Sequence, residues 1–251
     1  MLFSDATRGA VQELLPEYAG GSLASLCSWA DEVRFKYRWS SALHYIDTPD
    51  FRCNYNYDRD CHDSDGVKDR CAAGAIKNYT SQLASSSSSS AQYNLTEALL
   101  FLAHFVGDIH QPLHVGFTSD LGGNSINVHW YKRSTNLHHV WDTSIIETAD
   151  ERFYDSSISA LVDDIGQNIT QGYWNNEIAE WESCPGIDLA CPDIYAAESI
   201  KDACKWAYRN ATPGTYLADD YFLSRLPIVE MRLAQGGVRL AAILNRIFAH
   251  G

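Results

Sequence analysis

The sequence predicts a mainly α-helical fold: a single domain over residues 1–251, built from many helices with one short β-hairpin. Apolar residues recur at helical spacing through most of the chain. The length of 251 residues suits one compact domain, and 45% hydrophobic residues suffice for a substantial core. Gly122-Gly123, followed by alternating Ile126, Val128 and Trp130, indicates the hairpin.

Before residue 94 the pattern predicts three helices separated by polar segments. They are expected at Ala6–Leu15, Ser22–Arg34 and Ala72–Ala84. The second would place Asp31 near its end. The Cys-rich polar stretch Thr48–Arg70 is typical of a loop, and the six serines Ser85–Ser90 are typical of a flexible connector.

A strong helix is expected after Asn94, whose side chain can cap it, with Glu97 at the third helical position. Pro112 ends this helix. Its apolar stripe consists of Leu95, Ala98, Leu99, Leu102, Phe105 and Val106. Further helices are predicted at Leu137–Ile146, Ser156–Asn168, Tyr173–Trp181 and Ile194–Tyr208, and a long one at Tyr221–Phe248, kinked at Pro227 and loosened at Gly236-Gly237.

The charge of the chain limits its partners. A net charge of −13 argues against a broad basic surface for duplex DNA. It does not exclude nucleic acid as a substrate, because divalent cations can supply a local positive field. No apolar run reaches the roughly eighteen residues that a membrane span needs.

Two histidine-aspartate pairs share one spacing, His104-x-x-x-Asp108 and His138-x-x-x-Asp142. Residues four apart lie on one face of a helix, so each pair can hold one divalent cation. A lone histidine is usually a hydrogen-bonded core residue and a single pair can be a polar contact between turns, but further candidates stand nearby. The full predicted ligand set is Asp31, His44, His104, Asp108, His114, His138 and Asp142.

This set points to a metal cluster. Four imidazoles and three carboxylates exceed the four ligands of one zinc, and the mixture suits zinc better than calcium or magnesium. Asp108 is the candidate for a bridging carboxylate. Neighbouring zinc ions indicate hydrolysis of a phosphate ester.

Several long motifs resemble one family. They are Ser28–Arg34, Leu43–Asp47, His104–His114, Gly122–Asn124, Asn136–Asp142, Arg225–Val229 and Gln235–Leu240. The chain resembles the plant type I nucleases, also called bifunctional nucleases or endonucleases, over nearly its whole length. These are similar to fungal single-strand-specific zinc nucleases and, more distantly, to bacterial zinc phospholipase C.

The resemblance implies three zinc ions in a mostly helical fold. The first would take Asp31, His44, His104 and Asp108, and the second His114, His138 and Asp142. The third would share Asp108, and its other ligands belong to an opening segment that this sequence lacks. The resemblance therefore implies a front-truncated chain without its signal peptide.

The implied activity is hydrolysis of single-stranded RNA and DNA to 5′-phosphorylated products, with 3′-nucleotidase activity. Asp31 would orient or deprotonate the attacking water, Arg34 would bind phosphate oxygens, and Asn124 would hydrogen-bond the phosphate. The base would be held by Tyr45, Asp47 and Leu121, through stacking, a polar contact and an apolar contact. Other interpretations remain: a surface ion pair for Arg34, a turn residue for Asn124, and a core residue for Tyr45.

The seven cysteines and four sequons favour an oxidising compartment. The resemblance implies the disulfides Cys53–Cys204, Cys61–Cys71 and Cys184–Cys191, with Cys27 unpaired because its partner lies in the missing segment. The sequons stand at Asn78, Asn94, Asn168 and Asn210. We therefore expect the full-length protein in the secretory pathway, extracellular or vacuolar.

Two alternative functions remain open. One is a phospholipase C-like zinc phosphodiesterase, built on the same metals but accepting a lipid. The other is an inactive, truncated metal-binding glycoprotein. For the nuclease interpretation, the expected partners are single-stranded RNA or DNA and 3′-nucleotides as substrates, with no membrane and no obligate protein partner.

Overall fold

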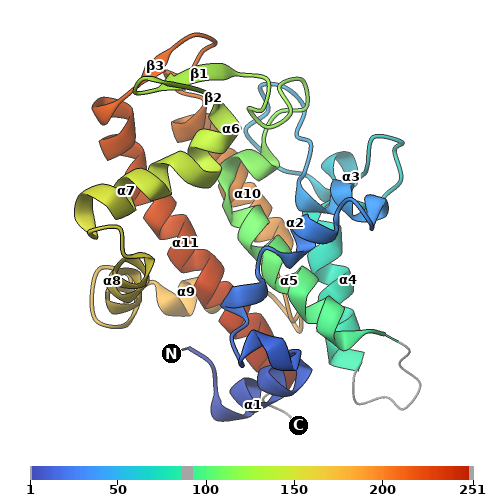
Figure 1. The fold of residues 1–251 in the computed structure, drawn as a ribbon. Coiled ribbons are helices and arrows are strands. Elements are labelled where there is room, and N and C mark those ends of the chain that lie inside the picture. The colour runs from blue at the N-terminus through green and yellow to red at the C-terminus, as the bar shows by residue number, and fades with distance from the viewer. Residues whose placement is uncertain (1, 86–92, 249–251) are drawn as a thin grey trace.

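The computed structural model describes residues 2–85 and 93–248 and shows a mainly α-helical protein with a small sheet. Figure 1 shows the sheet at one end of the molecule and the two termini near the opposite end. Helices α5 (Leu95–His110) and α11 (Asp219–Phe248) run between these ends. The predicted fold class is confirmed. No described helix is long and apolar enough to cross a membrane.

Helix α1 (Asp5–Leu14) lies within one residue of the prediction at each end, and Ser4 caps it by accepting from the Thr7 N–H. The single helix predicted at Ser22–Arg34 is wrong. A 3₁₀ turn (Ala24–Leu26) precedes the short α2 (Trp29–Val33). The break leaves the carbonyl of Cys27 outside a helical ladder, where it accepts a hydrogen bond from His104 at 2.6 Å. The Cys27 carbonyl therefore bonds to the distant His104 side chain instead of to a backbone N–H of a helix.

The region up to residue 93 otherwise follows the predicted order. A 3₁₀ helix (Arg38–His44) leads into the expected loop, which contains a single turn of helix, α3 (Tyr57–Asp60). Helix α4 (Ala72–Ala84) has the predicted bounds. Residues 86–90 of the predicted serine connector lie outside the described residues.

Helix α5 is the core of the fold. The Asn94 side chain accepts from the Glu97 N–H at 3.2 Å, as a cap should. Leu99, Leu102 and Phe105 of the predicted stripe are fully buried, and so are residues on other faces such as Phe101. A helix that is apolar nearly all round is covered on all sides. Helices α4, α10 and α11 pack against it, and the 3₁₀ helix Pro112–Val115 follows it.

The predicted hairpin is present, and it gains a third strand. Strands β1 (Asn127–Trp130) and β2 (Arg133–Asn136) pair antiparallel. A two-residue strand, β3 (Tyr216–Leu217), adds to β1 in parallel, giving the order β2-β1-β3. A strand this short carries too little pattern to be predicted.

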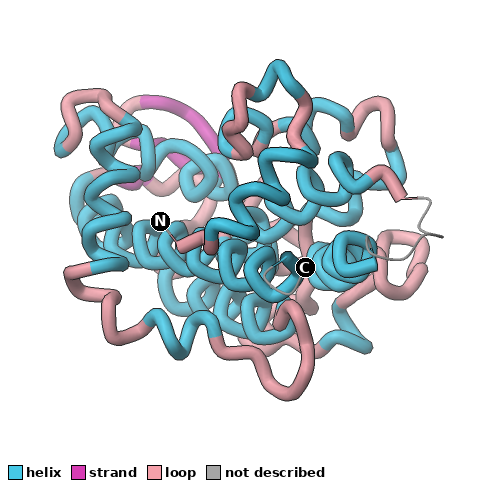
Figure 2. Tube along the Cα trace, turned by 90° about the horizontal axis from the view of Figure 1, so that it is seen from below, coloured by secondary structure: helices cyan, strands magenta, loops and turns pink. Residues whose placement is uncertain are grey.

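After the sheet the chain is helical again. α6 (Leu137–His139), a π-helical segment (Val140–Ser144) and α7 (Ile145–Phe153) replace the predicted Leu137–Ile146 helix. α8 (Ile158–Thr170), α9 (Ile178–Glu182) and α10 (Pro192–Asp202), the last extended by a π segment (Ala203–Ala207), follow. The prediction for α9 began five residues too early, because residues 172–177 form turns. Figure 2 shows helices filling most of the view from below.

Helix α11 is continuous from Asp219 to Phe248, so the predicted loosening at Gly236-Gly237 is wrong. A Cβ added at Gly236 would lie 3.6 Å from the His110 ring, an ordinary van der Waals contact, so α11 packs directly beside the end of α5 here. Tertiary contacts outweigh the low helix propensity of glycine here. Pro227 also lies within the helix.

Candidate metal centre

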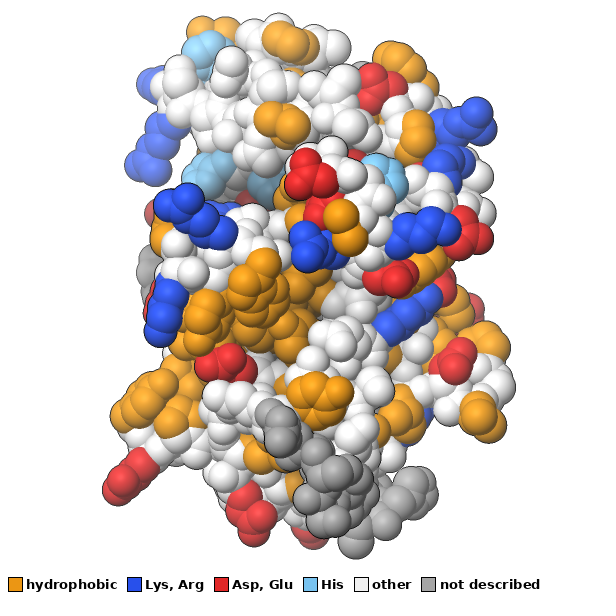
Figure 3. Space-filling model, turned by 90° about the vertical axis from the view of Figure 1, so that its right-hand side faces the viewer, with side chains coloured by type: hydrophobic (Ala, Val, Ile, Leu, Met, Phe, Trp, Pro, Cys, Tyr) orange, Lys and Arg blue, Asp and Glu red, His pale blue; other side chains and the backbone are white. Residues whose placement is uncertain are grey.

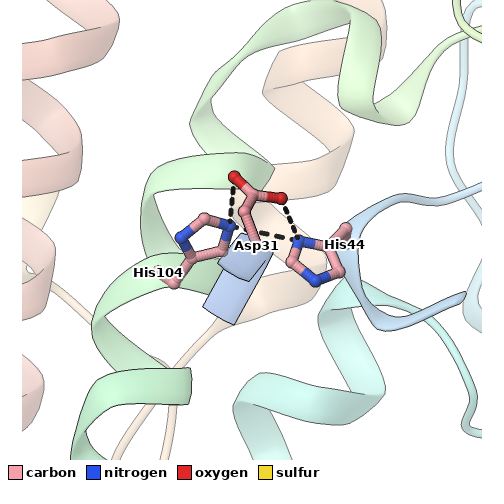
Figure 4. A group of neighbouring side chains, drawn as sticks. All are labelled: Asp31, His44 and His104. Carbon is pink, nitrogen blue, oxygen red and sulfur yellow. Dashed lines mark hydrogen bonds and ion pairs between the residues drawn. The ribbon is translucent and has the colours of Figure 1, made fainter. Parts of the chain in front are cut away.

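The first group of ligands comes from three separate elements. Asp31 lies on α2, His44 ends the 3₁₀ helix Arg38–His44, and His104 lies on α5. Figure 4 shows the three side chains pointing toward one another. His44 Nδ1 lies 3.1 Å from His104 Nε2, and each of these nitrogens lies 3.7 Å from a carboxylate oxygen of Asp31. The arrangement could hold one metal ion.

Asp108 connects this group with a second one. Its Oδ2 lies 3.0 Å from His44 Nδ1 and 3.2 Å from His104 Nε2. Its Oδ1 lies 3.7 Å from the ring of His114. The two oxygens of one carboxylate thus face different ligand groups.

The second group consists of His114, His138 and Asp142, and it too could hold a metal ion. Asp142 Oδ1 lies 3.4 Å from His114 Nε2, and Oδ2 lies 3.2 Å from His138 Nε2. His138 and Asp142 straddle the change from α6 to the π-helical segment. The structure therefore brings all seven predicted ligands together in two adjoining groups.

Backbone carbonyls fix the orientation of three imidazoles. The Nδ1–H groups of His104, His114 and His138 donate to the carbonyls of Cys27, His44 and Gly122 at 2.6–2.7 Å. Each ring is then held in the tautomer whose Nε2 lone pair is free to bind a metal.

His44 is turned the other way. Its Nδ1 faces the site, and its Nε2 is buried without a hydrogen-bond partner among the described residues.

The ionisation of the site reflects concentrated negative charge. Burial opposes protonation of His104, but hydrogen bonding and charge from Asp108 raise its pKa to about 9. The pKa of buried His114 also rises to about 9, because Asp108 and Asp142 are close. The pKa of His138 is lowered by burial and by His114. A divalent cation would neutralise the same field that favours these protons. The donor set, imidazole nitrogens and carboxylates, therefore fits zinc.

The expected substrate residues line a cleft beside the ligands. A cavity of about 690 Å³ is bordered by Arg34, Tyr45, Asp47, Leu121 and Asn124, together with His44, His114 and His138. Burial raises the pKa of Asp47, and nearby His62 opposes this. Tyr45 is 38% exposed and Leu121 64% exposed, so neither is a core residue.

Arg34 and Asn124 make contacts that relate to their alternative interpretations, a surface ion pair and a turn residue. Arg34 Nη1 lies 3.8 Å from Asp31 Oδ1, and both side chains are about half exposed, so this ion pair is weak and can open. The Asn124 amide donates to the Leu121 carbonyl at 2.9 Å within the turn. Asn124 nonetheless lines the cleft.

The structure also contains contacts that the sequence did not indicate. Gln111 Nε2 donates to Asp142 Oδ1 at 2.6 Å, which orients that carboxylate. The carbonyls that fix the imidazoles could not be predicted either, because any residue type supplies a carbonyl. The adjacency of Gln111 to the His104-Asp108 motif was the one available signal for its role.

The disulfides and sequons are placed as follows. Disulfides join Cys53–Cys204, Cys61–Cys71 and Cys184–Cys191, the pairs that the resemblance implies, and Cys27 is free. Asn78, Asn94 and Asn210 are exposed. Asn168 is half-buried, and its amide donates to the Asp164 carbonyl.

Comparison with known proteins shows which family the chain belongs to. The model of the S1/P1 nuclease family matches residues 1–249. The chain is 60% identical to Endonuclease 4 of Arabidopsis thaliana, over 98% of this chain and 84% of that protein. It is 61% identical to Endonuclease 2 of the same plant, over 95% of this chain and 82% of that protein. It is 33% identical to Nuclease S1 of Aspergillus oryzae, over 97% and 85%. The resemblance to plant type I nucleases is thus confirmed, and the chain belongs to the S1/P1 nuclease family.

Proposed function

We propose that this protein is a zinc-dependent endonuclease that hydrolyses single-stranded RNA and DNA to 5′-phosphorylated products and also acts as a 3′-nucleotidase. The main support is the convergence of seven imidazole and carboxylate side chains in two adjoining groups beside the cleft, with Asp108 between the two groups. Relatives named as nucleases share most of the chain.

Zinc, when bound, lowers the pKa of a water molecule and polarises phosphoryl oxygens. His44, His104 and Asp108 would hold one ion, together with Asp31. His114, His138 and Asp142 would hold another. The third zinc implied by the resemblance stays a prediction, with Asp108 as its ligand from this chain.

The remaining side chains would bind and orient the substrate. The Asp31 side chain is half exposed, so its carboxylate is accessible to an attacking water and can orient it or accept its proton. The Arg34 guanidinium can release Asp31 and offer two N–H donors to phosphate oxygens. Asn124 can turn its amide from the Leu121 carbonyl to the phosphate.

The base would stack on Tyr45. The exposed Tyr45 ring and the Leu121 side chain border the same cavity, so a base can lie between them. The half-buried Asp47 carboxylate can accept from a base edge. Stacking of this kind needs a base that has left a helix, which favours single strands. Figure 3 shows acidic and basic side chains interspersed on one face of the molecule, without a broad basic area for duplex DNA.

The test compares substrates and one matched pair of variants. The purified zinc-loaded protein is assayed on a single-stranded oligonucleotide, its duplex and phosphatidylcholine. We expect the single strand to be cleaved fastest, with 5′-phosphate on the products. Asp142→Ala should lower turnover by more than about 100-fold. Asp163→Ala, an exposed aspartate on α8, should leave turnover unchanged.

Two outcomes would contradict the proposal. Preferential hydrolysis of phosphatidylcholine would favour the phospholipase C-like alternative. Zinc binding without turnover of any substrate would favour the inactive metal-binding protein.

We also propose the secretory pathway as the location of this protein. The three disulfides and the exposed sequons at Asn78, Asn94 and Asn210 support it. Glycosidase treatment of the native protein followed by mass measurement is the test. A mass without added sugar would contradict the proposal.

A further inference from the structure

A second cavity adjoins the metal ligands on the side of the sheet. It has a volume of about 610 Å³ and shares Asn124 and His138 with the cleft that contains Tyr45. We propose that this cavity binds the nucleoside on the 3′ side of the scissile phosphate. The inference rests on the proposed nuclease function and extends it from one base to two.

The floor of this cavity is the polar face of the sheet. Val128 and Trp130 of β1 point into the core, so Asn127 and His129 point outward. In the β1–β2 register Asn127 lies opposite Asn136, and His129 lies opposite Ser134. These four side chains line the cavity, and the ligands His138 and Asp142 border it too. One polar face therefore leads directly to the second metal group.

An aromatic pair borders this floor at the third strand. Tyr216 does not itself line the cavity, but its ring stacks on His129, which does. His129 is paired with Tyr216 of β3, and their rings stack with centroids 4.3 Å apart and planes 14° from parallel. Tyr216 is 70% exposed. An exposed aromatic ring beside a polar groove is the usual platform for an unpaired base.

The remaining chemistry of the cavity suits a nucleoside. The amides of Asn127 and Asn136 and the hydroxyl of Ser134 can each donate and accept, as base edges and sugar hydroxyls require. Among the described residues that line this cavity, Asp142 carries the only carboxylate, and it is a metal ligand. Although the chain has a net charge of −13, no other carboxylate among these lining residues would repel a phosphate group.

The proposed reaction determines the direction in which a nucleic-acid strand would lie across the two cavities. A 3′-mononucleotide has its single base on the leaving side of the phosphate, and Tyr45 would hold that base. The two cavities meet at Asn124 and His138, beside the metal ligands. A strand with its phosphate at the metals and its leaving nucleoside in the Tyr45 cleft would therefore carry its next nucleoside into the sheet cavity.

Two substrates that differ by one nucleoside isolate this subsite. Adenosine 3′-monophosphate needs only the Tyr45 cleft, whereas adenylyl-(3′→5′)-adenosine needs both cavities. We expect Tyr216→Ala to raise the KM for the dinucleotide, relative to that for the mononucleotide, by about fivefold or more. Tyr216→Phe should restore the wild-type ratio, since it keeps the ring.

Tyr173→Ala is the matched control, because Tyr173 is 88% exposed and, unlike Tyr216, is neither part of the sheet nor stacked on a residue that lines the cavity. Its KM ratio should equal that of the wild type. A Tyr216→Ala ratio within about twofold of the wild type would overturn the subsite.

A binding measurement separates failure of the subsite from failure of the proposed function. If the wild-type protein hydrolyses neither substrate, the nuclease proposal fails. Binding of the fluorescently labelled dinucleotide to the zinc-loaded protein then decides the subsite, by fluorescence anisotropy. Weaker binding by Tyr216→Ala than by Tyr173→Ala supports the subsite, and equal binding overturns it.

Discussion

Gln111 joins two parts of the metal centre through one amide group. Its Oε1 accepts from the Leu113 N–H at 2.5 Å, which caps the 3₁₀ turn that carries His114. Its Nε2 donates to Asp142 Oδ1 at 2.6 Å. That same oxygen lies 3.4 Å from His114 Nε2. Replacement of Gln111 by alanine should therefore weaken the positioning of His114 and Asp142, although no metal ligand is itself substituted.

The expected magnitude follows from the hydrogen bonds that Gln111→Ala removes. Loss of an outer partner of a ligand usually lowers metal affinity by about 10- to 100-fold. This corresponds to about 1.4 to 2.8 kcal/mol. The range agrees with about 1.5 to 3 kcal/mol for one hydrogen bond to a charged group. Asp31, His44 and His104 make no hydrogen bond to Gln111, so the first group should keep its affinity.

The assay is a zinc titration against a chelator of known affinity. We expect the wild-type protein and Gln167→Ala, an exposed glutamine on α8, to give the same curve. Gln111→Ala should lose affinity at one class of site only. Unchanged affinity at every site would refute the reasoning. Equal weakening of all sites, together with a lower melting temperature, would show general destabilisation instead.

Three further predictions concern other parts of the chain. Asp108→Ala should lower zinc content at both groups, since its two oxygens face both; elemental analysis that finds unchanged zinc per protein would contradict a bridging role. A denatured, unreduced sample should contain one reactive thiol, at Cys27, and a thiol titration that finds none or three would contradict the disulfide pairing. Hydrogen bonds and charge from Arg239 lower the pKa of Glu198 against the effect of burial. A lowered folded pKa stabilises the protein above the unfolded value of about 4.3, and this contribution is lost as pH falls through the folded pKa. In urea unfolding, the free energy of unfolding of Glu198→Gln should therefore lie below that of the wild type at pH 6 and approach it near pH 3. A difference in this free energy that stays constant with pH would contradict the prediction.

Helices with strong local signals were predictable. The bounds of α4 match, and α5 begins at the Asn94 cap and ends before Pro112. Local signals also mispredicted residues 22–34, where the tertiary contact between Cys27 and His104 accompanies a break in the helix. The strand β3 depends wholly on pairing with β1, since His129 pairs with Tyr216, 87 residues later in the chain.

In the candidate site, too, features with a local sequence signal were predictable and features set by tertiary contacts were not. Spacing alone identified His104 with Asp108 and His138 with Asp142. The first pair lies on α5, and the second joins α6 to the π-helical segment that directly follows it. The family resemblance was needed to assign the other ligands to two groups. The sheet cavity was not predicted at all, because Asn127 and Ser134 are ordinary strand residues until the register places them beside His138.

The position of Asp108 depends on residues that are distant in sequence. Asp108 lies in the last turn of α5, and the carbonyls at the end of a helix need donors from elsewhere. The Ile109 carbonyl accepts from the Ser199 hydroxyl of α10, and the His110 carbonyl accepts from Arg232 Nε of α11 at 3.0 Å. The buried Arg232 cation also lies at the negative end of the α5 dipole. The turn that presents the bridging carboxylate is therefore stabilised by α10 and α11. A fragment ending after Asp142 would contain every predicted metal ligand and still lack the donors that hold this turn.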